Sequence, residues 1–208
     1  MTSDSRRAGG GTLFTEPVLV VNQRAKLVET THEFGVFDQY GRSLGAVVEV
    51  GQHLLRKALR LLPNCEQYIS QKFEVRDTGG SVVLKVTRPA KALKSRFLVT
   101  RADGSPIGEI SQQNVFGKVR FAFTAGGRRI GELRAENWRA WDFSITDGDG
   151  AEVARVTKTY AGFLAEAFTT ADNYVVEMYG HLADPLASMV VASALTVDTA
   201  LKQAEHHT

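Results

Sequence analysis

The sequence predicts a mainly β protein of the α+β class, an antiparallel meander of strands that ends in one apolar helix. Two observations lead to this prediction. A short pattern occurs five times: an alternating strand, a turn of Asp or Gly residues, and a second alternating strand. A single apolar segment with helical character then follows near the C-terminus. Successive hairpins at a regular spacing are typical of antiparallel meanders.

Each of the five repeats begins with a phenylalanine and is expected to form one β-hairpin. The repeats cover residues 34–45, 73–86, 97–110, 121–133 and 143–156. Asp-Gly and Gly-Gly pairs supply the positive φ angles that two-residue hairpin turns need. We therefore expect a two-residue turn in each hairpin.

Two further strands precede the first hairpin, and one follows the last. Pro17 opens a strand over residues 17–23, and a shorter strand is expected at Lys26–Glu29. Residues 173–178 read as the final strand because apolar and β-branched residues dominate them. Residues 158–172 are mixed in character and receive no assignment.

Residues 52–62 change from a strand period to a helical period. One face of a helix would carry Leu54, Leu55, Ala58, Leu61 and Leu62, and the other would carry His53, Arg56, Lys57 and Arg60. Basic amphipathic helices lie in membrane interfaces. A helix with this pattern can also cover one end of a barrel with its leucines and leave its basic face in solvent. Both interpretations stay open from the sequence.

The C-terminal helix is expected to start at Asp184 and Pro185, as N-cap and first helical residue, and to run from Leu186 to about Lys202. Its stretch of 12 residues is apolar or small on every side, which indicates burial all round. A bilayer core needs about 20 such residues. The better interpretation is a helix threaded through a barrel, and about 12 strands enclose enough room for one helix.

Length and composition indicate one domain. A chain of 208 residues with 43% hydrophobic content can bury one core, which we place at residues 13–203, between a disordered tail (1–12) and a frayed tail (204–208). The formal charge of +2 argues against a nucleic-acid-binding protein. The single cysteine, Cys65, excludes an intrachain disulfide. The first residues lack the apolar core of a signal peptide, so we expect a cytoplasmic location.

The sequence predicts no catalytic residue, no metal ligand and no cofactor. The histidines show no metal-binding spacing with one another or with Cys65, apart from the terminal pair His206 and His207. Asp147 and Asp149 resemble the start of a calcium loop, but the remaining acidic positions of such a loop are absent. Turn formation explains these two aspartates better.

Two long stretches contain basic residues and no acidic ones, residues 78–102 and 110–131. Side chains two residues apart in a strand point to the same face. Two pairs of this kind occur on neighbouring hairpins, where we expect them to lie side by side: Lys94 with Arg96, and Lys118 with Arg120. One interpretation is a binding site for anionic lipid headgroups. The other is a solvated outer face whose charge is balanced by acids on other strands.

Four segments, taken in order, resemble the phospholipid scramblase and LURP-one-related family. They are PVLVVNQ (17–23), FGVFDQYGRSLG (34–45), the Trp-containing connection ENWRAW (136–141), and TTADNYVV (169–176) before the apolar helix. The resemblance covers residues 13–203. It implies the Tubby C-terminal fold, a closed 12-stranded antiparallel barrel around a central hydrophobic helix. It also implies a lipid-associated protein without enzymatic activity.

Animal members of that family carry a proposed calcium segment just before the terminal helix, with acidic residues at alternating positions. The matching stretch here, residues 170–181, keeps Asp172 but has Tyr174 and Val176 at ligand positions and His181 where a closing acid would stand. Calcium needs several oxygen ligands, so we expect no calcium site.

The leading hypothesis is a phospholipid scramblase-related protein that binds anionic phospholipid or a membrane surface, without enzymatic activity and with no nucleic-acid partner. Peripheral attachment to the inner face of the plasma membrane follows from it. A closed barrel with its apolar helix inside offers no polar path across a bilayer, so binding rather than scrambling is expected. The alternative is a soluble scaffold or stress-response protein that acts through a protein partner and has no lipid role.

Overall fold

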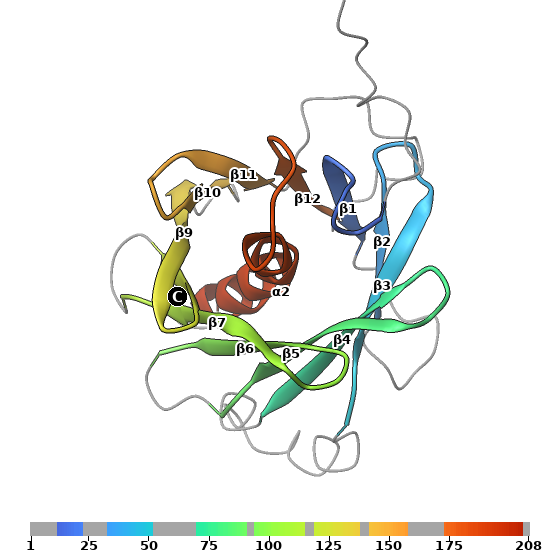
Figure 1. Ribbon diagram of the computed structural model, residues 1–208, viewed down its shortest axis with the longest axis horizontal. Helices are drawn as coiled ribbons and strands as arrows, with labels where there is room; N and C mark the ends of the chain where they lie inside the picture. The colour runs from blue at the N-terminus through green and yellow to red at the C-terminus, as the bar shows by residue number, and fades with distance from the viewer. Residues whose placement is uncertain are drawn as a thin grey trace, which may run out of the picture.

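The computed structural model describes residues 12–22, 33–51, 70–90, 94–114, 119–137, 142–157 and 173–205. The described strands are β1 (Val18–Asn22), β2 (Glu33–Phe37), β3 (Ser43–Glu49), β4 (Gln71–Asp77), β5 (Val82–Arg88), β6 (Arg96–Arg101), β7 (Pro106–Gln112), β8 (Arg120–Ala125), β9 (Arg128–Asn137), β10 (Asp142–Asp147), β11 (Glu152–Thr157) and β12 (Asn173–Met178). Each strand is antiparallel to its neighbours, and β1 pairs with both β2 and β12, which closes the sheet into a barrel (Figure 1). The helix α2 (Leu186–Glu205) follows β12. This confirms the predicted closed barrel of 12 strands.

All five predicted hairpins are present, and the first phenylalanine of each repeat points into the barrel. The hairpins are β2–β3, β4–β5, β6–β7, β8–β9 and β10–β11. The five phenylalanines are at most 7% exposed: Phe34, Phe73, Phe97, Phe121 and Phe143. Two of them, Phe97 and Phe121, meet edge to face with ring centroids 6.4 Å apart, a favoured geometry for aromatic pairs. The repeated phenylalanine is therefore a core residue.

The prediction of two-residue turns was wrong for four of the five hairpins. Only the turn at Gly126 and Gly127, with φ angles of 55° and 74°, connects its strands by two residues. The other four have three-residue loops. In the β2–β3 hairpin, for example, Asp38 pairs with Arg42, and the Gly41 amide donates to the Asp38 carbonyl. Such a loop is a type I turn closed by one residue with positive φ, and Gly41 has a φ of 84°.

Aspartate explains the choice of the longer loop. The Asp38 Oδ1 accepts hydrogen bonds from the amides of Tyr40 and Arg42, both at 2.9 Å. Asp77 and Asp147 hold their own turns in the same way, each with two backbone amides. A short side chain that satisfies backbone donors within a turn stabilises that turn.

A β-bulge interrupts every hairpin shortly after its turn. In β6–β7, Val99 faces Gly108 and Thr100 faces Pro106, so Ile107 has no partner. The unpaired residue is apolar in each hairpin: Leu44, Val83, Ile107, Ile130 and Val153. Bulges bend a strand and increase its twist. The same bulge at five places therefore distributes the curvature that closes the barrel.

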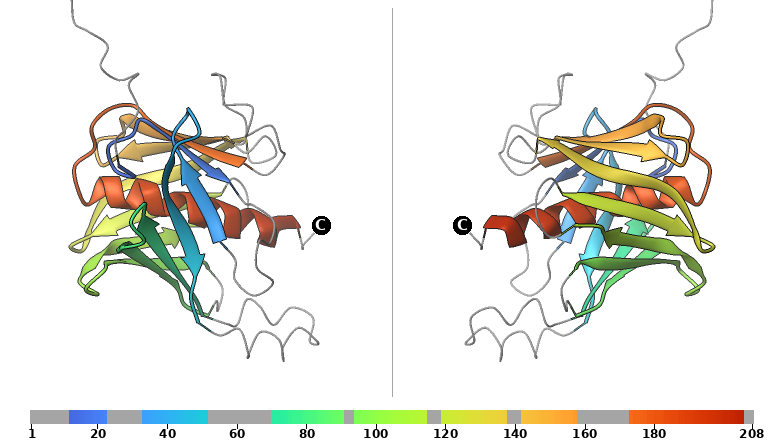
Figure 2. Two further views of the ribbon diagram at one scale, coloured as in Figure 1. Left: turned by 90° about the vertical axis from the view of Figure 1, so that its right-hand side faces the viewer. Right: turned by 90° about the vertical axis from the view of Figure 1, so that its left-hand side faces the viewer.

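The barrel has two different ends. The five hairpin turns and the segment 179–185 that leads into α2 lie at one end, which we call the tight-turn end. The opposite ends of the strands, from which β1 leads to β2, β3 to β4, β5 to β6, β7 to β8, β9 to β10 and β11 to β12, form the other end, which we call the long-connection end. The helix α2 enters the barrel at the tight-turn end and ends at the long-connection end (Figure 2).

The helix lies along the barrel axis and forms the centre of the core (Figure 1). The described side chains from Ala187 to Val197 are at most 8% exposed. A cavity of ≈ 10 Å³ remains between the helix and strands β1 to β4, lined by Val36, Val191 and Leu195 among others. That volume is at the lower limit for one water molecule. The predicted helix threaded through a barrel is therefore confirmed, and its described side chains are buried against the strands.

No helix among the described residues is long and apolar enough to cross a membrane. The helix begins at Leu186, so Pro185 precedes it, and it ends at Glu205, three residues beyond the expected end at about Lys202. Residues 203–205 are Gln, Ala and Glu, which favour helix continuation. The predicted strand at Lys26–Glu29 and the predicted helix at 52–62 lie outside the described residues.

Hydrogen bonds and an ion pair connect the start of α2 to strand β6. The Ser188 hydroxyl and amide donate to the Asp184 Oδ1 at 2.7 and 3.3 Å, and Arg101 in the β6–β7 turn pairs with the Asp184 Oδ2 at 3.2 Å. Partial burial raises the pKa of Asp184, but the hydrogen bonds from Ser188 and Arg101 outweigh it, so this pKa lies below its usual 3.8. The ionised carboxylate thus stabilises the helix start.

Replacing Asp184 is expected to weaken the fold in a pH-dependent way. Asp184→Ala removes the cap and should cost about 1 kcal/mol at neutral pH. Because the folded pKa is lowered, the contribution of the charge is complete above the unfolded pKa and is lost as the pH falls through the folded pKa. Urea unfolding of both proteins should give a constant difference between about pH 7 and pH 5 that shrinks below about pH 4. A difference that stays constant into acid would contradict a role for the charge, and Asp184→Asn, which keeps a cap, is the control.

Candidate anion-binding site

The outer surface of strands β6 to β9 carries Lys94, Arg96 and Arg120, which are the predicted anion-binding residues that the structure describes. We call this surface the β6–β9 face and define it by the outward side chains Lys94, Arg96, Glu109, Arg120, Glu132, Arg134 and Glu136. Side chains of the intervening residues, such as Phe97, Ile110, Phe121 and Leu133, are completely buried in the barrel. The period of two in each strand therefore places the strand members of this set on the same side of the sheet, and Lys94 lies two residues before the start of β6.

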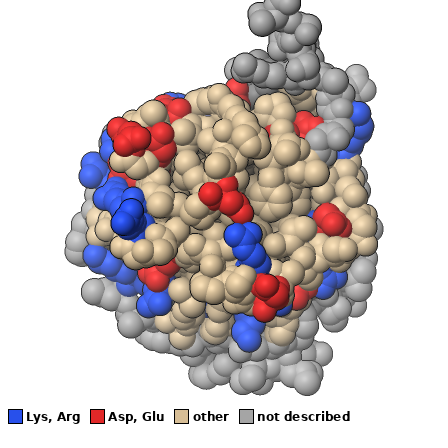
Figure 3. All heavy atoms as spheres, in the orientation of Figure 1, with Lys and Arg blue, Asp and Glu red and all other residues tan. Residues whose placement is uncertain are grey.

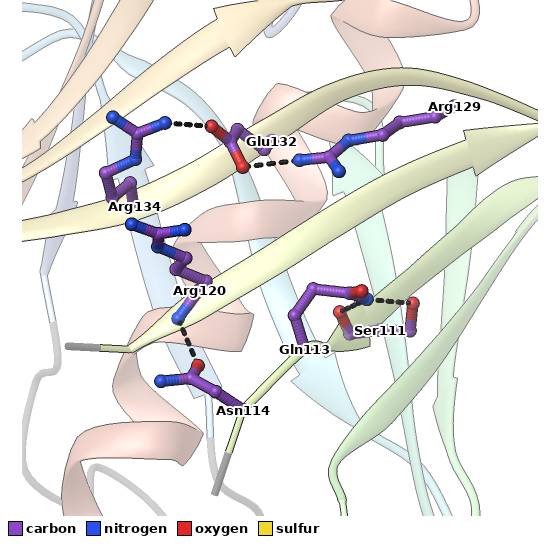
Figure 4. Close-up of polar contacts among 7 residues, drawn as sticks. All are labelled: Ser111, Gln113, Asn114, Arg120, Arg129, Glu132 and Arg134. Carbon is purple, nitrogen blue, oxygen red and sulfur yellow. Dashed lines mark hydrogen bonds and ion pairs between the residues drawn. The ribbon is translucent and has the colours of Figure 1, made fainter. Parts of the chain in front are cut away.

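Arg120 and Arg134 are directly opposite each other on β8 and β9. Residues in this relation have Cβ atoms about 5 Å apart. Figure 4 shows the Arg120 side chain extending toward Arg134. Arg120 has no ion pair with any carboxylate in the described part of the chain. Two like charges in direct opposition destabilise a sheet, so this pair has a cost that an anion would relieve.

One carboxylate serves two arginines beside this pair. Glu132 accepts hydrogen bonds from Arg134 with one oxygen and from Arg129 with the other (Figure 4). The Arg134 Nε is buried and has no hydrogen-bond partner among the residues that the structure describes. Buried polar atoms are normally satisfied. Arg120 and Arg134 together carry two positive charges, whereas Glu132 carries one negative charge and also pairs with Arg129. They also have N–H donors that Glu132 does not use.

Arg96 and Lys94 lie on the same face but have partners of their own. Arg96 forms an ion pair with Glu109 on β7 at 3.0 Å, and the Lys94 ammonium donates to the Gln113 carbonyl at 2.7 Å. Strand β7 separates Arg96 from Arg120, which places their strands about 10 Å apart. Lys94 and Arg96 therefore lie on the same side of the sheet as Arg120 but two strands away from it, and Lys118, the partner predicted for Arg120, lies outside the described residues.

The backbone around Arg120 is held by amide side chains. The Asn114 Oδ1 accepts from the Arg120 amide at 3.1 Å (Figure 4). The Gln112 side chain donates to the Asn114 carbonyl at 2.8 Å. Gln112 also accepts from the Ser95 amide at 3.0 Å. These bonds link β6, β7 and β8 at their long-connection ends and keep Arg120 in place.

The sequence missed Arg134, which follows Glu132 and so lies beyond the acid-free stretch that drew attention to Arg120. Among the other predicted site residues, Arg56, Lys57, Arg60 and Lys118 lie outside the described residues and stay predictions, as does the absence of a calcium site, since Asp172 lies outside as well. Within the described ranges, no group of three His, Cys, Asp or Glu side chains could hold a metal ion.

Comparison with known proteins assigns the chain. A sequence model named Scramblase matches residues 9–201. The chain belongs to the scramblase family. A phospholipid scramblase family protein of Schizosaccharomyces pombe is 24% identical over 178 residues, which cover 79% of this chain and 46% of that relative. The scramblase-family chain therefore spans less than half of that relative's length. No solved structure matches the chain.

Proposed function

We propose that this scramblase-family protein binds anionic phospholipid at a membrane surface through the β6–β9 face, without catalysing a reaction. The observation that carries the proposal is the direct opposition of Arg120 and Arg134 on an outer face where Arg134 shares Glu132 with Arg129 and where Glu136 accepts a hydrogen bond from Ser144. Guanidinium groups bind phosphate oxygens in a bidentate way and remain charged at all physiological pH values. A phosphate group at this position would reduce the repulsion between the two arginines and offer an acceptor to the Arg134 guanidinium.

Binding at the outer surface agrees with the filled interior. Pockets that enclose small ligands measure about 300–1,000 Å³, whereas the cavity beside α2 measures ≈ 10 Å³. A lipid chain would have to displace the helix. The outer face, in contrast, presents charged side chains that suit a headgroup. Arginine and lysine bind anions but neither take up nor release a proton near neutral pH, so their chemistry favours recognition over catalysis.

Neutralising the arginine pair is expected to weaken binding to anionic vesicles. Each basic residue near an anionic surface contributes about 1 kcal/mol, so Arg120→Gln with Arg134→Gln should reduce partitioning about 30-fold. The measurement is co-sedimentation with vesicles of phosphatidylcholine alone and with added phosphatidylserine or phosphatidic acid. Binding should require the anionic lipid and decline with salt, because the screening length falls from about 10 Å at 0.1 M to about 3 Å at 1 M.

The matched control is Arg76→Gln with Arg128→Gln. It changes the net charge by the same amount, and Arg76 pairs with Glu74 two residues away as Arg134 pairs with Glu132. Arg76 and Arg128 lie near the tight-turn end. Equal losses in both double variants would mean that net charge, not the β6–β9 face, determines binding. A wild-type protein that ignores anionic vesicles would favour a scaffold with a protein partner.

A further inference from the structure

Two arginines at the tight-turn end each have a carboxylate of their own. Arg42 pairs with Asp38 at 2.8 Å and Arg101 with Asp184 at 3.2 Å. Figure 3 shows basic side chains beside carboxylates on that surface. On the β6–β9 face, in contrast, no acceptor among the described residues binds the Arg120 guanidinium. A bound anion would therefore compete with no described carboxylate for Arg120.

The neighbour of Arg120 on the β7 side is neutral. The Gln113 amide donates to the Arg120 carbonyl at 2.9 Å, so these two residues lie side by side. The Gln113 side chain is turned to Ser111, where it donates to the carbonyl at 2.9 Å and to the hydroxyl at 3.1 Å (Figure 4). The charged neighbour of Arg120 is thus Arg134, on the β9 side.

The two carboxylates that lie beside Arg134 on β9 are bonded elsewhere or shared. Glu132 binds Arg134 with one oxygen and Arg129 with the other, and Glu136 accepts from the Ser144 hydroxyl at 2.9 Å. The Arg134 Nε has no partner among the described residues. Two opposed guanidinium groups therefore have donors that no described carboxylate uses.

A phosphomonoester matches two opposed guanidinium groups better than a phosphodiester does. A guanidinium group binds two oxygens in a bidentate contact. A phosphomonoester has three terminal oxygens and a charge of about −1.5 to −2 at pH 7, so each of two guanidinium groups can bind two oxygens if they share one. A phosphodiester has two terminal oxygens and a single charge, and it satisfies one such contact.

We propose that Arg120 and Arg134 together select lipids whose headgroup is a phosphomonoester, as in phosphatidic acid, over lipids whose phosphate is a diester. This inference rests on the proposed function, which requires only an anionic phospholipid. The Arg120 side chain is exposed and that of Arg134 is partly exposed. A phosphate that carries no headgroup alcohol can approach both side chains directly.

Vesicles that differ in their phosphate chemistry test this selectivity. Co-sedimentation is measured with phosphatidylcholine vesicles that contain either phosphatidic acid or phosphatidylglycerol, a diester, at matched zeta potential. The wild-type protein should bind the phosphatidic acid vesicles about tenfold more tightly, which corresponds to one additional hydrogen bond to a charged group. Equal binding to both vesicles would overturn the selectivity and leave the proposed function intact. Failure to bind either vesicle would overturn both.

The double variant Arg120→Lys with Arg134→Lys separates geometry from charge. Lysine keeps the charge but binds phosphate as a point charge. The variant should therefore bind phosphatidylglycerol vesicles within about twofold of the wild type and lose most of its preference for phosphatidic acid. Arg76→Lys with Arg128→Lys is the matched control and should keep the preference, and circular dichroism checks that both proteins are folded. An unchanged preference in the first variant would overturn the assignment to this pair.

Phosphomonoesters also occur as soluble molecules, and a competition experiment distinguishes the two sources. Glycerol 3-phosphate is the headgroup of phosphatidic acid without the acyl chains. At a concentration equal to that of the accessible phosphatidic acid, it should leave the protein on the vesicles, because it lacks the surface potential that attracts the remaining basic residues. Complete displacement would assign the pair to a soluble phosphomonoester and overturn the lipid as its ligand.

Discussion

A chain that ends at Asp184 is expected to lose cooperative folding. The truncation removes α2, whose described side chains from Ala187 to Val197 are at most 8% exposed. Loss of one buried leucine or methionine side chain typically costs 2–5 kcal/mol, and Met189, Val190, Val191 and Leu195 would be lost together. A domain of this size is stable by about 5–15 kcal/mol, so the barrel cannot tolerate a void of that size.

The truncated protein should be insoluble, or compact with an exposed apolar interior that binds the dye ANS. Thermal unfolding monitored by near-ultraviolet circular dichroism should show no cooperative transition. A chain shortened by residues 206–208 alone keeps the whole helix and is the control. A soluble truncated protein with a sharp unfolding transition would show that the barrel wall is stable without its helix.

Adding a side chain at Gly108 or Gly131 is expected to have the second-largest effect. A Cβ atom at Gly131 would lie 2.4 Å from the Thr146 carbonyl oxygen and 3.4 Å from the Leu186 Cδ1. At Gly108 it would lie 2.4 Å from the Thr124 carbonyl oxygen and 3.1 Å from the Met189 Cε. In both positions the neighbouring strand and the helix approach the glycine from two sides, so neither can yield without disturbing the other.

Gly108→Val and Gly131→Val should each destabilise the protein by about 3 kcal/mol, at the upper end of the range for overpacked cores. Urea unfolding at equilibrium measures the effect. Gly180→Ala is the control, because a Cβ atom there would meet no atom within 4 Å, and it should change the stability by less than about 0.5 kcal/mol. If the valine variants were as stable as this control, the close approach of strand and helix at these glycines would not matter for stability.

The hairpins could be predicted because local sequence determines them. Alternating residues, phenylalanine at the start and glycine in the turn act within about a dozen residues. The turn length could have been predicted too. Three of the four three-residue loops place a glycine three residues after an aspartate, as at Asp38 and Gly41 or Asp77 and Gly80. The adjacent Asp-Gly or Gly-Gly pair indicates a two-residue turn, whereas the Asp-x-x-Gly spacing indicates a three-residue loop.

The partner of Arg120 could not be read from alternation alone. Ala125 faces Arg128 across the two-residue turn, and without a bulge that register would place Arg120 opposite Leu133. The bulge at Ile130 shifts the pairing by one residue, so that Arg120 faces Arg134. A shift of one residue exchanges the two faces of a strand. The sequence alone therefore could reveal a basic face but not the arginine pair on it.

The closure of the barrel by β1 and β12 has a consequence for how the protein matures. Val18 pairs with Glu177, so the seam joins residues from nearly opposite ends of the chain. During synthesis the hairpins can form one by one, but the seam and the central helix can form only after β12 and α2 have left the ribosome. Contacts between distant residues slow folding, and the unfilled inner faces are meanwhile open to aggregation. We therefore expect the pairing of β1 with β12 and the burial of α2 to be late steps in the folding of this barrel.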